Sequence, residues 1–277
     1  MKNYNLDYGM PTLIENRSLH DNVRTCRKLG LQFIELNMNL PEYQVEQLKD
    51  RKVYQDISDR YGIYFTIHLE ENLNVADFNH AVAQSYVDTV RRTIEVAHEL
   101  HVPVLNMHMN HGIHFTLPDR KVQLYEQYEE AYLESMERFI QMCESEISAD
   151  KIQICIENTD GFKEYEKAAL ERMLVSRVFS LTWDIGHSNS CDNVDEPFLM
   201  EHEDKLKHFH IHDSIGSRAH LTLGSGEIDL NQRLSIAKEH ECRCVVETKT
   251  LDSLKESVEW LKRNRYMNNH RKKHINK

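Results

Sequence analysis

Residues 207–213 read Lys-His-Phe-His-Ile-His-Asp, and the alternation within this stretch decides the fold class. Successive side chains of a β-strand point to opposite faces, so Phe209 and Ile211 share one face and the three histidines share the other. A parallel sheet that is covered on both sides is apolar on both faces. A strand with one apolar and one polar face therefore predicts a closed barrel, whose apolar side meets helices and whose polar side lines the interior.

The same unit repeats along the chain as a short apolar strand followed by an amphipathic helix. The expected strands are 6–10, 32–38, 64–69, 103–109, 152–158, 179–185, 207–213 and 242–248. The expected helical stretches are 19–29, 41–60, 77–100, 118–147, 165–174, 230–239 and 251–262. Alternating strands and helices imply a parallel sheet, and eight such units in about 250 residues match a (β/α)8 barrel. We expect an α/β fold with a single TIM-barrel domain over residues 1–261, followed by a basic C-terminal tail over residues 262–277.

The charge of the chain is divided unevenly between this body and the tail. Thirty-four Lys and Arg stand against 45 Asp and Glu, which gives a formal net charge of −11. Residues 262–277 hold seven of the basic residues and no acid, so the body carries 27 basic and 45 acidic residues, or −18. This balance argues against a protein that coats nucleic acid, which needs a basic surface. A locally basic cleft, or a tail that grips an anionic partner, remains an alternative to a solvated end.

Cellular location is predicted from what the sequence lacks. The N-terminal stretch MKNYNLDYGM has no apolar core of a signal peptide, and no run of about 18 apolar residues is present to span a membrane. The six cysteines are typical of free thiols in a reducing compartment. We therefore expect a cytoplasmic protein with no membrane partner.

Chemically active residues occupy the last inward positions of the expected strands five to eight. These residues are Glu157, Asp184, His210 and Glu247. The carboxyl ends of the strands carry the active site of a barrel, so we expect these side chains to converge on one axis. Three carboxylates around one imidazole repel one another unless a cation lies between them. Oxygen-rich ligation with one imidazole suits Mn²⁺, Mg²⁺, Co²⁺ or Zn²⁺.

Two further histidines, His68 and His108, end the expected strands three and four and point into the same mouth. Added imidazoles favour Zn²⁺ or another borderline metal and allow a second ion. The alternative is that all six residues are separate buried polar groups, each satisfied by hydrogen bonds. Their matching positions on consecutive strands favour a metal site. We expect one to three divalent ions, Zn²⁺ or Mn²⁺ before Co²⁺ or Mg²⁺.

Two loop segments extend the candidate site. His187 follows Asp184 by three residues and lies over the same opening, and Arg218 and His220 follow the expected strand seven. We expect His187 and His220 to bind a metal or to hold substrate hydroxyls. We expect Arg218 to clamp a phosphate or a carboxylate of the substrate. The alternative for each is an inert surface residue.

Four other features carry weaker predictions. Glu35 faces inward on the expected strand two, as either an acid of the barrel core or a substrate contact. His111 belongs to the polar rim of the loop after strand four. Cys155 faces inward below the carboxylates, which argues against nucleophilic catalysis by its thiol. The glycines at 224 and 226 indicate a turn rather than a phosphate-binding loop, because no strand is expected before them and no Gly-Lys-Ser/Thr follows.

Taken in order, these motifs resemble the xylose isomerase-like TIM-barrel superfamily. This superfamily includes sugar and sugar-phosphate isomerases and epimerases, and the endonuclease IV type of abasic-site nuclease. The motifs are Ile-Glu-Asn at 156–158, Asp-x-x-His at 184–187, His-x-x-Asp at 210–213, His-x-x-x-Gly-x-Gly at 220–226 and Val-Glu-Thr at 246–248. The resemblance covers essentially the whole chain, and it implies a barrel with a metal centre at its C-terminal mouth.

The resemblance implies two uses of this mouth. In the epimerase and isomerase branch, the matches to the four residues of strands five to eight bind one divalent metal, and Glu157 and Glu247 act as a paired acid and base. In the nuclease branch, the residues that join them to hold three zinc ions match His68, His108, His187 and His220. The ninth nuclease ligand corresponds to Arg218, whose guanidinium does not bind a cation, and the loop after strand three is acidic.

We therefore expect a divalent-metal-dependent isomerase or epimerase that acts on a small sugar or sugar phosphate, with Glu157 and Glu247 as catalytic residues. The alternative is an endonuclease IV-like zinc phosphodiesterase that acts on abasic DNA or a small phosphoester. A third hypothesis is a metal-containing barrel that binds a partner without catalysis. The expected partner is a small sugar, and the acidic body argues against nucleic acid. Related barrels often pair, which allows a homodimer.

Overall fold

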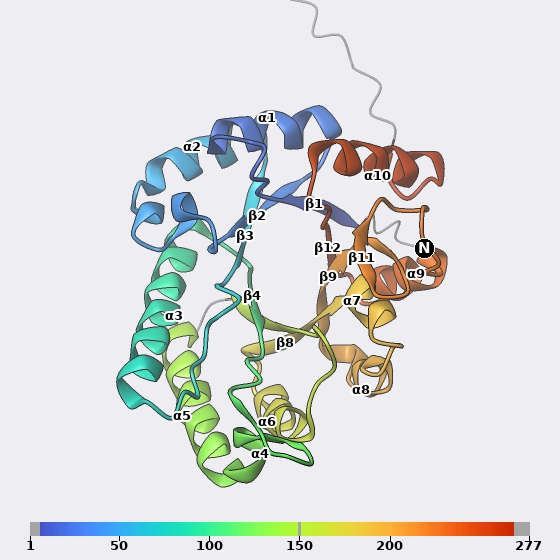
Figure 1. Cartoon of the computed structure of the whole chain (residues 1–277). Coiled ribbons are helices and arrows are strands. Elements are labelled where there is room, and N and C mark those ends of the chain that lie inside the picture. The colour runs from blue at the N-terminus through green and yellow to red at the C-terminus, as the bar shows by residue number, and fades with distance from the viewer. Residues whose placement is uncertain (1–5, 149–150, 269–277) are drawn as a thin grey trace, which may run out of the picture.

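The computed structural model describes residues 6–148 and 151–268, and it confirms the predicted barrel (Figure 1). Eight parallel strands close in the order β1-β12-β9-β8-β7-β4-β3-β2. They are β1 (Asp7–Pro11), β2 (Phe33–Asn37), β3 (Tyr64–His68), β4 (Val104–His108), β7 (Gln153–Glu157), β8 (Phe179–Asp184), β9 (Leu206–Ile211) and β12 (Arg243–Val246). Each overlaps one of the eight strands that the sequence predicts.

Helices surround this barrel and cover the outer side of its strands (Figure 1). They are α1 (Leu19–Leu29), α2 (Arg51–Tyr61), α3 (His80–Leu100), α4 (Leu124–Gln127), α5 (Glu129–Ile147), α6 (Glu164–Val175), α7 (Ile185–Ser190), α8 (Glu196–Glu201), α9 (Leu230–Glu239) and α10 (Leu251–Arg263). Short 3-10 turns occur at η1 (Pro41–Tyr43), η2 (Gln47–Lys49) and η3 (Glu203–Lys205). None of the helices within the described ranges is both long and apolar enough to cross a membrane.

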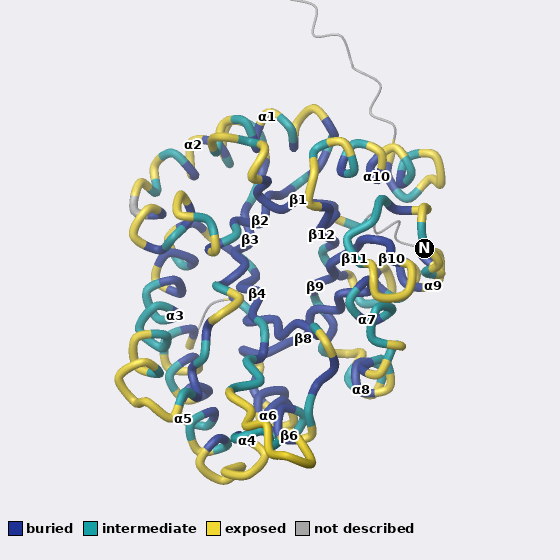
Figure 2. Tube along the Cα trace, in the orientation of Figure 1, coloured by how far each residue is buried: buried dark blue, intermediate teal, exposed yellow. Residues whose placement is uncertain are grey.

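The alternation within each strand separates the core from the site. In β3, the buried Phe65 packs edge-to-face on Tyr54 of α2, with ring centroids 5.2 Å apart. The next residue, Thr66, points into the barrel and donates a hydrogen bond of 3.0 Å to Glu35 of β2. The hydrophobic core therefore lies between the strands and the helices. Toward the barrel axis the strands carry buried polar side chains such as Glu35 and Thr66, and Figure 2 shows that the barrel strands are largely buried.

One predicted helix, 118–147, is wrong over its first part. Residues 114–123 form an antiparallel hairpin of β5 (His114–Thr116) and β6 (Lys121–Gln123), and helical structure begins only at Leu124. Pro118 lies in the turn between them, where Leu117 donates a backbone hydrogen bond of 2.8 Å to Arg120. The flanking Phe115 and Val122 are typical of strands, so local turn chemistry overrides the helical pattern that follows.

Three other segments contain structure that the sequence did not reveal. The predicted helix 41–60 forms two 3-10 turns before α2, and the stretch between β8 and β9 contains α7 and α8. A second hairpin, β10 (Asp213–Ile215) with β11 (Arg218–Leu221), follows β9, so a strand does precede Gly224. Of the predicted basic tail, residues 262–268 are described and α10 ends at Arg263; residues 269–277 lie outside the described part.

Candidate metal centre

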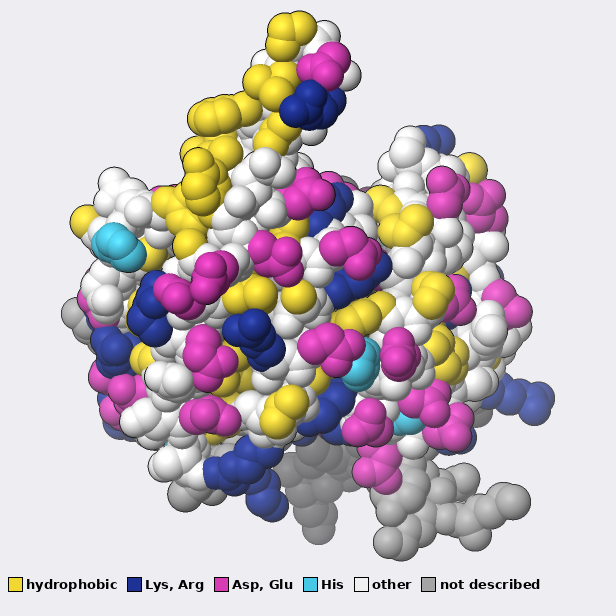
Figure 3. Space-filling model, turned by 90° about the horizontal axis from the view of Figure 1, so that it is seen from below, with side chains coloured by type: hydrophobic (Ala, Val, Ile, Leu, Met, Phe, Trp, Pro, Cys, Tyr) yellow, Lys and Arg dark blue, Asp and Glu magenta, His cyan; other side chains and the backbone are white. Residues whose placement is uncertain are grey.

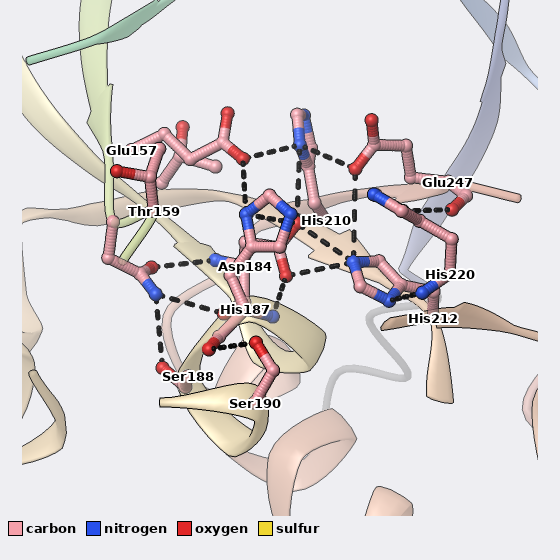
Figure 4. Close-up of polar contacts among 12 residues, drawn as sticks. Glu157, Thr159, Asp184, His187, Ser188, Ser190, His210, His212, His220 and Glu247 are labelled. Carbon is pink, nitrogen blue, oxygen red and sulfur yellow. Dashed lines mark hydrogen bonds and ion pairs between the residues drawn. The ribbon is translucent and has the colours of Figure 1, made fainter. Parts of the chain in front are cut away.

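Four strands bring the predicted ligands together at the C-terminal mouth of the barrel. Glu157 and Asp184 are the last residues of β7 and β8, His210 lies beside Asp184 in register on β9, and Glu247 follows β12 directly. All four are buried, and they offer ligand atoms that lie within 4.8 Å of one another. In Figure 4, Glu157 and Glu247 stand on opposite sides of the His210 ring. The sequence therefore identified a cluster that the tertiary structure does assemble.

The His210 ring has carboxylates on both of its nitrogens. Its Nδ1 atom lies 3.1 Å from Glu157 Oε1, 3.3 Å from Glu247 Oε2 and 3.9 Å from Asp184 Oδ2. Its Nε2 atom lies 2.9 Å from Glu35 Oε1. A neutral imidazole carries a single N–H, so one nitrogen of a neutral ring would direct a lone pair at carboxylate oxygens. The site therefore needs either a proton on the ring or a cation among the carboxylates.

The pKa shifts follow from this crowding. Burial opposes charge on every group, but the surrounding carboxylates outweigh it and raise the pKa of His210 well above its ordinary value. Burial is likewise the largest influence on Glu157 and Glu247, and it is overcome by the charge of His210, which lowers the pKa of both glutamates well below the ordinary range. Both side chains are therefore carboxylates at neutral pH, the form that binds a metal or accepts a proton.

The donor set fits a divalent cation. Three carboxylates and one imidazole are the oxygen-rich combination that Mn²⁺, Co²⁺ and Zn²⁺ accept. Oε2 of Glu247 is buried and makes no well-aligned hydrogen bond with any described residue. An unpaired buried carboxylate oxygen is costly, and a bound cation would remove that cost. The four residues would hold the ion, with Nδ1 as the imidazole donor atom.

His68 and His108 cluster around the other oxygen of Glu157. Their Nε2 atoms lie 3.5 Å and 3.1 Å from Glu157 Oε2, and Asn106 also donates to this oxygen. Nδ1 of His68 lies 2.7 Å from the carbonyl oxygen of Leu69, which only accepts, so Nδ1 carries a proton. Nε2 of His68 then faces Glu157 either as a second N–H or as a lone pair toward a metal. Burial opposes charging, but Glu157 raises the pKa of His68 to about 9.

His187 and His220 also lie at the mouth, with ring centroids 5.2 Å apart. Asp184 is the N-cap of α7 and accepts the backbone N–H of His187 at 2.7 Å, which holds His187 next to the proposed ligand. Burial lowers the pKa of His220 to about 4, so its ring is neutral at physiological pH. Both rings border the mouth cavity, where they can accept or donate hydrogen bonds to a substrate.

His212 completes a group of three histidines with these two, but its nitrogens are already occupied. Its Nδ1 atom accepts the backbone N–H of His220 at 2.8 Å, so the ring proton resides on Nε2. Nε2 lies 3.0 Å from the Asp184 carboxylate and donates to it. His212 therefore orients Asp184 and has no free lone pair for an ion of its own.

A cavity of about 620 Å³ opens above this centre. It is lined by His68, Glu71, Asn72, His108, Met109, Asn110, His111, Gly112, Glu157, Thr159, Asp160, His187, His220, Glu247 and Lys249. Arg218 does not border it: this residue is exposed on β11, and the structure does not bring it to the cluster. Instead Lys249 supplies a cation at the mouth, with Nζ 2.9 Å from Glu247 Oε1.

These observations agree with a comparison against known protein families. Residues 23–264 match the model of the family described as "Xylose isomerase-like TIM barrel". The chain belongs to this family. The chain is also similar to the uncharacterized protein MJ1311 of Methanocaldococcus jannaschii, with 28% identity over 77% of this chain and 74% of that protein.

Solved structures of other proteins share the fold over nearly the whole length of the chain. A D-tagatose 3-epimerase-like protein superimposes with a TM-score of 0.74 and 23% identity, covering 94% of this chain and 97% of the other. The IOLI protein, whose structure holds a zinc atom, superimposes with a TM-score of 0.69 and 16% identity, covering 94% and 96%. At these identities the likeness concerns the fold.

Three members of this xylose isomerase-like site were missed or left undecided at the sequence level. Lys249 follows Glu247 by two residues, and Asn106 precedes His108 by two on the same strand face, so both could have been found from the period of a strand. The position of Glu35 beneath His210 depends on the order of the strands in the barrel, so the period of a strand could not reveal it. Cys155 is buried, and burial raises the pKa of its thiol to about 12, which agrees with the prediction that it is not a nucleophile.

Proposed function

We propose that this protein is a divalent-metal-dependent isomerase or epimerase that acts on a small sugar. The observation that carries the proposal is the placement of Glu157 and Glu247 on opposite sides of one buried centre, beneath a polar cavity. The names of the structural neighbours support it, because one is a D-tagatose 3-epimerase-like protein and another is a barrel with a bound zinc atom.

Each of the two glutamates has one oxygen at the centre and one held by a neighbour. Oε1 of Glu157 faces His210 and its Oε2 accepts from Asn106; Oε2 of Glu247 faces His210 and its Oε1 accepts from Lys249. A divalent ion held by Glu157, Asp184, His210 and Glu247 would polarise a substrate carbonyl and acidify the neighbouring C–H. One glutamate then takes the proton from carbon, and the other, after taking up a proton from solvent, returns it to the opposite face.

The charges around the cavity favour a neutral sugar over a sugar phosphate. Lys249 is the one Lys or Arg among the described residues that line it, and this cation is paired with Glu247. Glu71 and Asp160 add two acids to the lining, and Arg218 lies elsewhere. Asn72, Asn110 and Thr159 present amide and hydroxyl groups, which suit the hydroxyls of a polyol.

Deuterium exchange tests the proton transfer directly. The purified protein is loaded in turn with Mn²⁺, Co²⁺ and Zn²⁺ and incubated in D₂O with a panel of ketoses, ketose phosphates and keto-glycosides. We expect deuterium to enter at the carbon next to the carbonyl of at least one neutral sugar, and Glu157→Gln and Glu247→Gln each to lower the rate of this exchange about 100-fold or more. No exchange at any carbon across the panel contradicts the proposal.

A zinc phosphodiesterase is the second candidate, because His68 and His108 gather at Glu157 Oε2 as ligands of a further ion could. Two observations weigh against it: His212 has no lone pair free for a third ion, and Lys249, the one Lys or Arg among the described residues that line the cavity, is paired with Glu247. The flank of the molecule seen in Figure 3 likewise mixes acidic and basic side chains. A labelled abasic duplex decides the DNA version, since nicking that depends on zinc and on His108 would favour the phosphodiesterase.

A further inference from the structure

A second polar layer lies directly beneath the proposed metal centre, inside the barrel. It consists of Glu35, Thr66 and His208, all of them buried. Glu35 accepts hydrogen bonds from Thr66 Oγ1 at 3.0 Å and from His208 Nε2 at 2.9 Å. The remaining oxygen of Glu35, Oε1, lies 2.9 Å from Nε2 of His210. The proposed proton transfer does not use this carboxylate.

The position of Glu35 favours a proton on Nε2 of His210, because this nitrogen lies within ion-pair distance of Glu35 Oε1, although the two atoms are not aligned as a hydrogen bond. A carboxylate only accepts hydrogen bonds, so the His210 nitrogen that faces it is the N–H. A ring whose Nε2 holds the proton presents the lone pair of Nδ1 to Glu157, Asp184 and Glu247. With the opposite tautomer, two lone pairs would meet at Glu35 and an N–H would point at the position of a cation.

We propose that Glu35 is a positioning residue that fixes His210 as an Nδ1 metal ligand. This inference rests on the proposed function only in requiring that the four-residue centre binds a divalent ion. A carboxylate behind a metal-bound imidazole orients the ring and raises its basicity, and loss of such a partner typically weakens metal binding about 10- to 100-fold. Glu35 thus acts on the metal through His210 and has no contact with the substrate cavity.

His208 provides the matched control. It binds the same carboxylate as His210, but its ring does not face Glu157, Asp184 or Glu247, and its Nδ1 atom has no hydrogen-bond partner among the described residues. His208→Gln therefore removes a donor from Glu35 and disturbs the same buried layer. It leaves the contact between Glu35 and His210 in place.

The test measures zinc affinity by competition with a chelator of known affinity, for the wild type, Glu35→Gln, Glu35→Leu and His208→Gln. Circular dichroism and melting in the presence of a chelator establish that each metal-free variant is folded. We expect the zinc dissociation constant to rise about 10-fold or more in Glu35→Gln, to rise further in Glu35→Leu, and to change less than about threefold in His208→Gln. Equal zinc affinity in the wild type and both folded Glu35 variants overturns the inference.

A double-mutant cycle separates positioning from a general loosening of the barrel. In a His210→Gln background, Glu35→Gln is expected to have no further effect on zinc affinity, because the ring through which Glu35 acts is gone. An undiminished effect would show that Glu35 acts by another route and overturns the proposal. If the wild type itself binds no zinc or manganese, it is the proposed function that fails.

A measurement on the wild type does not depend on the folding of any variant. In zinc-loaded protein labelled with ¹⁵N-histidine, His210 is assigned by its loss in His210→Gln. We expect its Nε2 to carry a slowly exchanging proton and its Nδ1 to show the shift of a metal-bound nitrogen. The reverse assignment, with Nε2 on the metal, contradicts the inference.

Discussion

Gly186 lies directly against the ring of His212, so close that a Cβ at position 186 would overlap the Cε1 and Nδ1 atoms of that ring. Only glycine therefore fits at position 186 without displacing the ring. The contact matters because His212 donates to Asp184, one of the four proposed ligands, from the opposite nitrogen. The ring, its proton and the carboxylate thus form one unit whose position depends on the absence of a single methyl group.

Gly186→Ala is expected to displace His212 and to weaken the metal centre. Overpacking of a buried site costs about 1–3 kcal/mol, so we expect a loss of that size in the free energy of unfolding, measured by urea denaturation without metal. Zinc affinity should also fall about tenfold or more, since Asp184 loses the ring N–H of His212, one of its two N–H donors. Ser190→Ala, in the same short helix, is the control and should leave zinc affinity unchanged. Unaltered zinc binding by Gly186→Ala would show that His212 does not orient the ligand.

Glu157→Gln and Glu247→Gln are each expected to lower the rate of deuterium exchange into the substrate by a factor of about 100 or more. A general acid or base contributes about 10²–10⁴ to a rate, and an amide neither takes nor gives the proton. The readout is exchange followed by mass spectrometry under saturating metal. Glu144→Gln on the exposed side of α5 is the control for the loss of a negative charge. Exchange at the wild-type rate in either active-site variant would contradict the assignment of that glutamate.

The catalytic efficiency, kcat/KM, is expected to depend on Lys249 and not on Arg218. Lys249 holds Glu247 Oε1 at 2.9 Å, whereas Arg218 is exposed and borders no part of the cavity. We expect Lys249→Met to lower kcat/KM about tenfold and Arg218→Ala to change it less than about twofold, as surface substitutions usually do. A large loss in Arg218→Ala, confined to phosphorylated substrates, would restore the predicted phosphate clamp.

The pair of His111 and Asp160 should make stability depend on pH. Nδ1 of His111 lies 2.7 Å from Glu166, and Nε2 contacts Asp160. Hydrogen bonds to these carboxylates raise the pKa of His111 to about 9, and the bond from His111 lowers the pKa of Asp160 to about 2. The pKa of His111 is higher in the folded protein than in the unfolded chain, so the charged ring stabilises the fold. This contribution is complete below pH 6.5 and disappears as pH rises through 9.

The lowered pKa of Asp160 has the opposite sign. Its contribution is present above the ordinary value of 3.8 and is lost as pH falls through 2. We therefore expect the difference in unfolding free energy between wild type and His111→Gln to be largest between about pH 4 and 6.5 and to shrink toward pH 9. Urea denaturation at pH 5.5, 7.5 and 9 with a chelator present measures it. A difference that stays constant across this range would falsify the assignment of the charged pair.

Removal of the metal is expected to lower the melting temperature. A ligand that binds only the folded state at 100 times its dissociation constant adds about 2.7 kcal/mol of stability. Zinc or manganese should therefore stabilise the wild type against heat but leave Asp184→Asn nearly unaffected. Elemental analysis of protein purified without a metal-binding tag counts the ions: one per chain agrees with the isomerase, and two or three favour the phosphodiesterase.

The sequence was sufficient for the barrel and for its proposed metal ligands because both depend on a period of two. Phe209 and Ile211 alternate with His208 and His210, and this alternation alone assigns each residue to the outer or inner side of a strand. Parallel strands that close into a barrel then bring their last inward residues to one mouth, whatever the strand order. The strand period alone is therefore enough to group Glu157, Asp184, His210 and Glu247.

What the tertiary structure decided concerns residues whose neighbours lie far away in the sequence. Glu35 meets His208, 173 residues further along the chain, and the neighbouring His210 across the barrel, so its function beneath the ligand depends on closure of the sheet. Arg218 occupies a motif position but lies exposed on the hairpin of β10 and β11, outside the lining of the cavity. Nδ1 of His212 accepts the backbone N–H of His220 and its Nε2 donates to Asp184, so neither nitrogen is free to bind an ion. A strand period fixes the face of a residue, but only the packed fold fixes which donor or acceptor faces each of its atoms.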